Sequence, residues 1–175
     1  MERIDTDILV IGGGSGGLSV AAGAVQMGVR VVLLEGHKMG GDCLNYGCVP
    51  SKALLAAASV AHAQGGNAAM GVGPGQATIN YGEAKDFAAS VIGQIAPHDS
   101  VARFEGLGVN VIEAFGRFIS PTEVQAGDWV VTARRIVIAT GSGPFVPPIP
   151  GLNDLPHYTN ETIFDLRARP DHLLI

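Results

Sequence analysis

The chain has 175 residues and a mass of 18.0 kDa, enough for one ordinary domain or slightly more. Apolar residues make up 47% and charged residues only 15%, which supports a buried core and argues against intrinsic disorder. The net charge of −5 gives no broad basic surface, so nucleic acid is not an expected partner. Glycine is distributed unevenly, because eleven of the 25 glycines fall within the first 50 residues.

The 22 residues between Asp7 and Arg30 carry no formal charge, a length that can span a bilayer. Residues 12–17, however, are five glycines and one serine, which would break a helix exposed to lipid. The N-terminus is acidic on balance and carries no signal-peptide cleavage pattern. The sequence therefore predicts no membrane association and, by default, a cytoplasmic location.

The first third of the chain predicts a β-α-β unit. Residues 8–11 form a continuous, largely β-branched run, as expected of a central strand buried on both faces. Residues 18–26 have helical spacing, and Gly28 can end that helix. Residues 29–34 predict a second buried strand, which should lie beside the first and parallel to it.

The middle of the chain predicts two helices joined by a surface segment. Residues 40–47 are expected to form a loop, and Pro50 suits the first turn of a helix. Residues 64–76 are glycine-rich and predict an excursion over the surface. A second helix is expected from about Tyr81, and Pro97 should end or kink it.

The remainder predicts short strands followed by a proline-rich exit. The strands are expected at residues 109–112, 115–119, 124–126, 129–132 and 136–139. Residues 144–151 hold four prolines and predict a semi-rigid linker, while residues 172–175 look like the opening of another buried strand. The predicted fold class is therefore α/β, a Rossmann-like domain with a parallel sheet, flanking helices and a small antiparallel β-meander.

Gly12, Gly14 and Gly17 have the spacing of the dinucleotide-binding fingerprint, between a predicted strand and a predicted helix. In this motif the first glycine permits a tight turn, the second lets a pyrophosphate approach the backbone, and the third lets helix and strand pack closely. Glu35, at the end of the second strand, is placed to hydrogen-bond the ribose of an adenosine. The fingerprint predicts a site for FAD or NAD without choosing between them.

Cys43 and Cys48 are separated by four residues. In a regular helix their Cα atoms would lie about 7.5 Å apart, so a disulfide requires Cys43 in the loop and a distorted entry to the helix. A helix N-terminus at Cys48, with Lys52 one turn later, would favour the thiolate. A redox pair is the favoured interpretation. Two unrelated buried thiols and half of a zinc site are the alternatives, although the scattered histidines lack ligand spacing.

Residues 40–52, which read Gly-Gly-Asp-Cys-Leu-Asn-Tyr-Gly-Cys-Val-Pro-Ser-Lys, resemble the active-site signature of the class I pyridine nucleotide-disulfide oxidoreductases. This family includes dihydrolipoamide dehydrogenase, glutathione reductase and mercuric reductase. The resemblance extends over the whole chain, including residues 116–118 and 139–142. It implies an FAD-binding domain, incomplete, at residues 1–150, with residues 151–175 as a linker and the start of an NAD(P)H-binding domain.

The resemblance also implies the chemistry. Electrons would pass from NAD(P)H through FAD to the Cys43–Cys48 disulfide and on to a small-molecule disulfide or a metal ion. Cys48 would lie against the flavin and Cys43 would exchange with substrate, in a homodimer that serves cell redox homeostasis. The implied FAD contacts are Gly12, Gly14, Ser15, Gly16, Gly17, Glu35, Gly41, Asp42, Lys52, Gly116, Thr140 and Gly141.

The sequence departs from the family at Asp42, which stands where threonine is usual and whose effect the sequence does not explain. A second dinucleotide fingerprint and the family's C-terminal interface domain are not among the 175 residues. We therefore expect an N-terminal fragment that does not turn over by itself. A stand-alone FAD-binding or thiol redox-switch module is the alternative, whereas a plain NAD-binding dehydrogenase domain leaves the cysteine pair unexplained.

Overall fold

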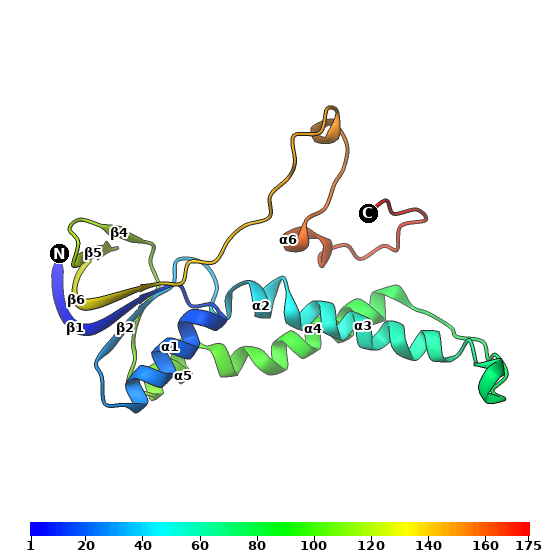
Figure 1. Cartoon of the computed structure of the whole chain (residues 1–175), viewed down its shortest axis with the longest axis horizontal. Coiled ribbons are helices and arrows are strands. Elements are labelled where there is room, and N and C mark those ends of the chain that lie inside the picture. Colours follow the sequence, from blue (N-terminus) through cyan, green and yellow to red (C-terminus); the bar gives the residue numbers. More distant parts are fainter. The chain divides into compact units, whose positions relative to one another are not determined.

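The computed structural model describes all 175 residues, which form two compact units. Unit 1 comprises Met1–Asn45 and Ile95–Gly143, and unit 2 comprises Tyr46–Gln94 and Pro144–Ile175. Unit 1 contains the β-sheet, whereas unit 2 consists of helices and long irregular segments (Figure 1). None of the helices combines the length and the apolar character needed to cross a bilayer.

The sheet of unit 1 has six strands in the order β3-β2-β1-β6-β5-β4. Its strands are β1 (Glu2–Ile11), β2 (Val31–Leu34), β3 (Asn110–Ile112), β4 (Gly116–Phe118), β5 (Glu123–Ala126) and β6 (Trp129–Ile138). The first four in this order are parallel, and β5 and β4 are added antiparallel. The predicted fold class is confirmed, and β1 lies centrally between β2 and β6 as expected.

Alternate side chains of the parallel strands enter two separate apolar clusters, one on each face of the sheet. One face is covered by α1 (Ser15–Gln26) and α5 (Val101–Gly106), which contribute Leu18 and Phe104 to the cluster. The other cluster joins β1 and β2 to Val124 and other side chains of the antiparallel strands. The carboxyl ends of β1 and β2 are thereby held from both sides.

Two strands are longer than the apolar runs that predicted them. β1 begins at Glu2 because its polar first half pairs with β6, from Glu2 opposite Trp129 to Ile11 opposite Ile138. The prediction of separate strands at residues 129–132 and 136–139 was wrong, since β6 is continuous. The exposed Arg134 and Arg135 interrupt its apolar pattern, but the backbone ladder to β1 does not need buried side chains there.

Two short helices of unit 1 were not predicted. Residues 40–47 are not wholly a loop, because α2 (Gly41–Asn45) forms one helical turn around the buried Leu44. Helix α5 is preceded by Ser100, whose hydroxyl accepts a hydrogen bond from the N–H of Arg103 at 3.2 Å. Elements of five or six residues are too short to show a hydrophobic period, so pattern analysis overlooks them.

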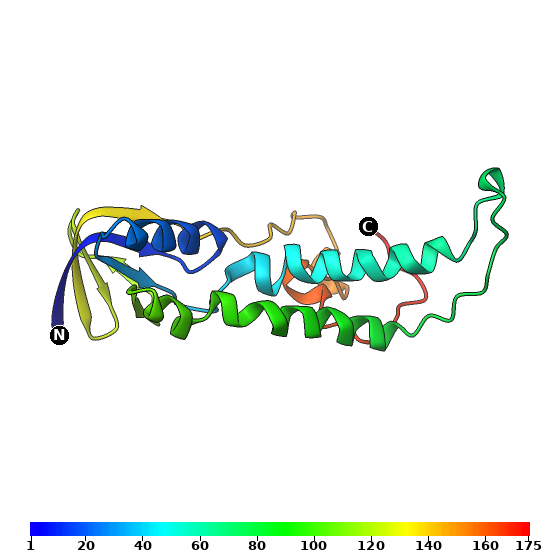
Figure 2. The same cartoon turned by 90° about the horizontal axis from the view of Figure 1, so that it is seen from below.

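Unit 2 contains the pair of long helices that the sequence predicts. Helix α3 (Cys48–Ala63) begins two residues before Pro50, and α4 (Tyr81–Ile95) ends two residues before Pro97, its last residue belonging to unit 1. The two helices run in opposite directions (Figure 2), and side chains from both line a hollow of about 420 Å³ at the end of α3. The joining segment is exposed and holds one 3-10 turn, Ala68–Met70.

The exit segment of unit 2 contains a 3-10 turn, Leu152–Asp154, and the short helix α6 (Asn160–Ile163). Lys85 of α4 donates a hydrogen bond to the carbonyl of Ile163 at 3.3 Å, and its ammonium lies 5.3 Å from the centroid of the Phe164 ring. Residues 172–175 form no strand, since strands need a paired neighbour and no ladder includes them.

Candidate functional site

Glycines 12 and 17 are required by the packing of the protein itself. Gly12 has φ of 109°, and a Cβ there would lie 2.3 Å from the carbonyl oxygen of Ala139. A Cβ on Gly17 would lie 1.8 Å from the carbonyl oxygen of Gly12. The end of β1, the start of α1 and the end of β6 therefore meet backbone to backbone, as the fingerprint requires of its first and third glycines.

Gly14 is different, because nothing in the chain requires a glycine at this position. Its φ of −81° suits any residue, and a Cβ there would meet only the Cα of Gly41 at 3.8 Å. A Cβ on Gly16 would meet no atom within 4 Å. Helix α1 also starts without a side-chain cap, so no side chain of the protein satisfies its first N–H groups. Open space and N–H groups without a side-chain cap at a helix N-terminus are what a bound anion needs.

Glu35 follows the last residue of β2 and is tied to the start of the glycine segment. Its Oε2 accepts the N–H of Gly13 at 2.6 Å, and its Oε1 accepts the N–H of His37 at 2.6 Å. Each carboxylate oxygen keeps further acceptor capacity for the hydroxyls of a ligand. The structure thus brings Glu35 and residues 12–17 together, as the sequence predicts.

Residues 39–45 lie against the glycine segment. The N–H of Gly40 donates to the carbonyl of Gly13 at 2.8 Å, and a Cβ on Gly41 would lie 2.7 Å from the Cα of Gly14. Asn45, which sequence reasoning missed, donates through Nδ2 to the carbonyls of Met39 and Gly41 at 3.2 and 2.8 Å. The asparagine closes the turn of α2, so the Gly41 backbone is held beside the N-terminus of α1.

The end of β6 brings a further predicted segment to the same place. The N–H of Ala139 donates to the carbonyl of Ile11 at 2.8 Å, and Thr140 follows, exposed, before Gly141 with φ of 68°. Gly116 has a packing reason of its own, because a Cβ there would lie 2.9 Å from Cδ1 of Leu34. Both segments lie at the carboxyl ends of β1 and β2, where open α/β sheets bind ligands.

The two cysteines fall in different units. Cys43 is half-buried in α2 of unit 1, next to the exposed Asp42 in the first turn. Cys48 is exposed and opens α3 of unit 2, earlier in that helix than the sequence predicts. Lys52 is exposed one turn later, a spacing that puts it on the same face of α3 as Cys48. No group of three or more His, Cys, Asp and Glu side chains is arranged to hold a metal ion.

The fold and the glycine segment define a dinucleotide-binding α/β domain. The family model described as pyridine nucleotide-disulphide oxidoreductase matches residues 6–175, and the chain belongs to this family. The predicted family is thereby confirmed. Members of the family use FAD together with NAD(P)H.

Curated relatives match the chain over nearly its whole length. Dihydrolipoyl dehydrogenase 2, chloroplastic, of Arabidopsis thaliana is 34% identical over 177 residues, which cover 99% of this chain and 31% of the relative. Mercuric reductase of Staphylococcus aureus is 29% identical, covering 98% and 31%, and glutathione reductase of Burkholderia cepacia is 33% identical, covering 100% and 38%. The chain spans about a third of the length of these relatives.

A solved structure supports the fold. The Cu(II) complex of the HOCl-induced flavoprotein disulfide reductase RclA from Escherichia coli superposes with a TM-score of 0.75 at 24% sequence identity. The superposition covers 92% of this chain and 34% of the RclA chain. At this identity the similarity shows a shared fold and no more.

Proposed function

We propose that the chain is the FAD-binding part of a FAD-dependent disulfide oxidoreductase. In this proposal electrons pass from NAD(P)H through FAD to the Cys43–Cys48 disulfide and on to a small-molecule disulfide or a metal ion. The observation that carries it is Gly14, a glycine at the N-terminus of α1 that the protein's own packing does not require. Family membership supports the reaction type, and the names glutathione reductase and mercuric reductase support the two substrate classes.

The residues of unit 1 fit a dinucleotide. The first N–H groups of α1, which no side chain caps, can donate hydrogen bonds to a pyrophosphate, and Glu35 can accept hydrogen bonds from the ribose hydroxyls. We assign the binding of FAD to Gly12, Gly14, Ser15, Gly16, Gly17, Glu35, Gly41, Asp42, Gly116, Thr140 and Gly141 of unit 1 and to Lys52 of unit 2. When bound, FAD supplies two-electron exchange between a nicotinamide and a disulfide.

The chain's own contribution to the chemistry is a reversible dithiol. Oxidation of Cys43 and Cys48 forms one S–S bond and releases two protons and two electrons, and reduction reverses it. The proposal gives Cys48, the first residue of α3, the position against the flavin. Cys43 then exchanges with the substrate, and Cys48, exposed in the chain alone, is covered by the cofactor.

The proposal includes an organisation for the whole enzyme. Residues 1–150 are the FAD-binding domain, and residues 151–175 are the linker and the start of an NAD(P)H-binding domain. The coverage of about a third of each relative supports further domains in the whole enzyme, because the relatives have length for them. We propose a homodimer located in the cytoplasm.

The cofactor site is tested by replacing Gly14 with alanine. The new methyl group fits the protein, so Gly14→Ala should lower the free energy of unfolding by less than about 1 kcal/mol. It should weaken FAD binding about tenfold or more, because the methyl group occupies the space of the pyrophosphate. Gly23→Ala, also on α1 with no atom within 4 Å of its Cβ, is the matched control. Equal FAD affinity in the two variants, measured by flavin fluorescence, contradicts the proposed site.

The cysteine roles are tested in the whole enzyme by stepwise reduction with dithionite or NADH. A thiolate against the oxidised flavin produces a long-wavelength absorption band, which Cys48→Ser should abolish and Cys43→Ser should retain. Persistence of the band in Cys48→Ser would show that the two roles are reversed or that the pair does not face the flavin.

A further inference from the structure

Phe115 holds its ring over the residue that follows Glu35. A Cβ on Gly36 would lie 2.4 Å from Cδ1 of the Phe115 ring, and all three of its closest contacts would be atoms of that ring. The ring therefore rests directly on the Gly36 backbone. Phe115 is nevertheless 76% exposed, so this contact covers only a small part of the side chain.

The backbone places this ring at the ligand-binding edge of the sheet. β2 and β3 are parallel, and the N–H of Glu35 donates to the carbonyl of Ile112, the last residue of β3, at 3.1 Å. The N–H of Ala114 donates to the same carbonyl at 3.0 Å, so the chain turns there and carries Phe115 across the end of β2. Ligands of such sheets bind outside the carboxyl ends of the strands.

We propose that the Phe115 ring is the platform on which the adenine of the dinucleotide stacks. This inference rests on the proposed function, in which Glu35 holds the adenosine ribose. Adenine is attached directly to that ribose, and the Phe115 ring packs on Gly36, the residue directly after Glu35. An exposed aromatic face is suited to a purine, because every base has a π-face that stacks on it.

Gly36 is part of the same arrangement. Any side chain at this position would occupy the volume of the Phe115 ring and displace it from the end of β2. Gly36 therefore leaves room for the Phe115 ring, and most of the surface of that ring remains exposed for contact with a ligand. The assignment makes Phe115 a binding residue for the ADP half of FAD and gives it no contact with the flavin half.

The test measures binding of FAD, ADP and FMN to the 175-residue chain by calorimetry. Phe115→Leu keeps an apolar cover over Gly36 but removes the π-face, and it should weaken FAD and ADP about tenfold. Phe115→Trp should restore both affinities. Phe118→Leu, on β4 and 46% exposed, is the control and should bind all ligands as the wild type does. FMN, which lacks the adenosine, should not distinguish Phe115→Leu from the wild type.

The outcomes separate this inference from the proposed function. If the wild-type chain binds neither FAD nor ADP, both are wrong. If it binds them and Phe115→Leu binds equally well, the adenine platform is wrong and the proposed FAD site stands. A loss that extends equally to FMN, or that accompanies a large fall in melting temperature, would also overturn the platform, because it would show a structural role for the ring.

Discussion

Units 1 and 2 bury their apolar side chains to very different degrees. In unit 1 all four side chains of β2 are at most 3% exposed, and both faces of the sheet are covered by apolar clusters. In unit 2 the buried residues are Pro50, Ala53, Lys85 and Ala88, while large side chains such as Leu55 and Val60 are 64% and 67% exposed. A site that depends on backbone contacts needs a closely packed support, and unit 1 supplies it.

The largest expected effect comes from adding one methyl group to the backbone contact of unit 1. Gly17→Ala places a Cβ 1.8 Å from the carbonyl oxygen of Gly12, a clash that only backbone movement can relieve. We expect a loss of more than about 4 kcal/mol in the free energy of unfolding, measured with urea. Gly16 is one residue earlier, and a Cβ there would meet no atom within 4 Å, so Gly16→Ala should change the free energy of unfolding by less than about 1 kcal/mol. Similar midpoints for the two variants would show that the contact is not rigid.

A pair of phenylalanines tests the difference between the units directly. Phe104 in α5 is 1% exposed, and Phe104→Ala should cost about 3–5 kcal/mol through the cavity it leaves. Phe87 in α4 is 47% exposed, so Phe87→Ala should cost less than about 1 kcal/mol. Thermal and urea unfolding measure both values. A loss at Phe87 as large as that at Phe104 would mean that α4 is buried more deeply than the structure shows.

The sequence predicts those parts of unit 1 whose residues carry their own pattern. The buried run of β1, the glycine spacing and Glu35 each have a local signal, and the structure places all of them together. The full length of β1 and the continuity of β6 have no such signal. Polar residues such as Glu2 and Arg135 join these strands because the partner backbone is in register, which only the folded sheet provides.

The candidate site was predicted unevenly for the same reason. Met39 and Phe115 act through contacts that folding creates, and neither belongs to a spaced motif. Asn45 lies within residues 40–52, but its hydrogen bonds to the backbone appear only in the folded turn. In helix α2 the Asn45 side chain hydrogen-bonds the Gly41 carbonyl and Leu44 is buried, whereas the glycines at positions 40, 41 and 47 predict a loop. Gly116 is the opposite case. The resemblance predicts it only as an FAD contact, whereas the structure shows that a side chain there would crowd Leu34.

A smaller and pH-dependent effect is expected in unit 2 from Lys85, which is 5% exposed. Burial lowers the pKa of its amine below the usual 10.5, Arg167 lowers it further and Asp165 opposes the shift. The Lys85 amine therefore binds its proton more tightly in the unfolded chain than in the folded chain. The free energy of unfolding of unit 2 should rise as the pH increases from the lowered pKa towards 10.5. Lys85→Met should remove this rise.

Amide hydrogen exchange across α4 and residues 159–167 measures the Lys85 effect locally, because it reports the opening of unit 2 separately from unit 1. Lys52→Met, which changes an exposed lysine on α3, is the control and should keep the rise with pH. Parallel pH profiles for wild type and Lys85→Met would show that the amine is hydrated and that α6 is not held by a buried charge.

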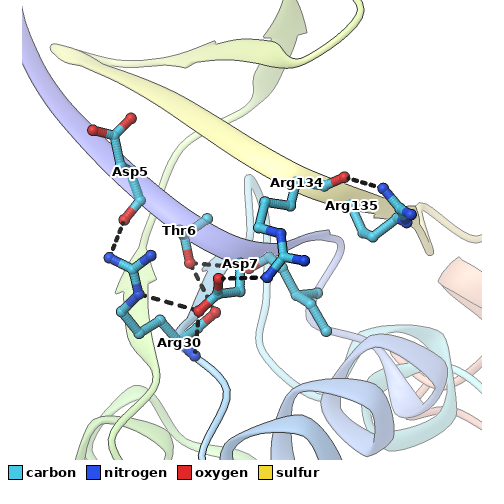
Figure 3. Close-up of polar contacts among 7 residues, drawn as sticks. Asp5, Thr6, Asp7, Arg30, Arg134 and Arg135 are labelled. Carbon is cyan, nitrogen blue, oxygen red and sulfur yellow. Dashed lines mark hydrogen bonds and ion pairs between the residues drawn. The ribbon is translucent and has the colours of Figure 1, made fainter.

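The smallest effect is expected from Asp7 of β1, whose carboxylate pairs with two largely exposed arginine side chains. Its carboxylate accepts hydrogen bonds from the side chain and the N–H of Arg30 at 3.1 and 3.3 Å and pairs with Arg134 at 3.4 Å (Figure 3). The Arg30 side chain, with smaller contributions from its N–H and from Arg134, holds the Asp7 pKa below 3.8. A lowered carboxyl pKa stabilises the fold above pH 3.8, and this contribution is lost as the pH falls through the lowered value.

Asp7→Asn should therefore unfold slightly more easily than wild type at neutral pH and identically at the acid end. The neutral-pH difference stays small because the side chains of Arg30 and Arg134 are 67% and 79% exposed, so water and salt screen the pair. Asp5→Asn is the control, because Figure 3 shows the Asp5 carboxylate pointing away from Arg30, which it contacts through its carbonyl. A large loss in Asp7→Asn that persists in high salt would mean that these ion pairs, and not the packed core alone, hold β1 beside β2 and β6.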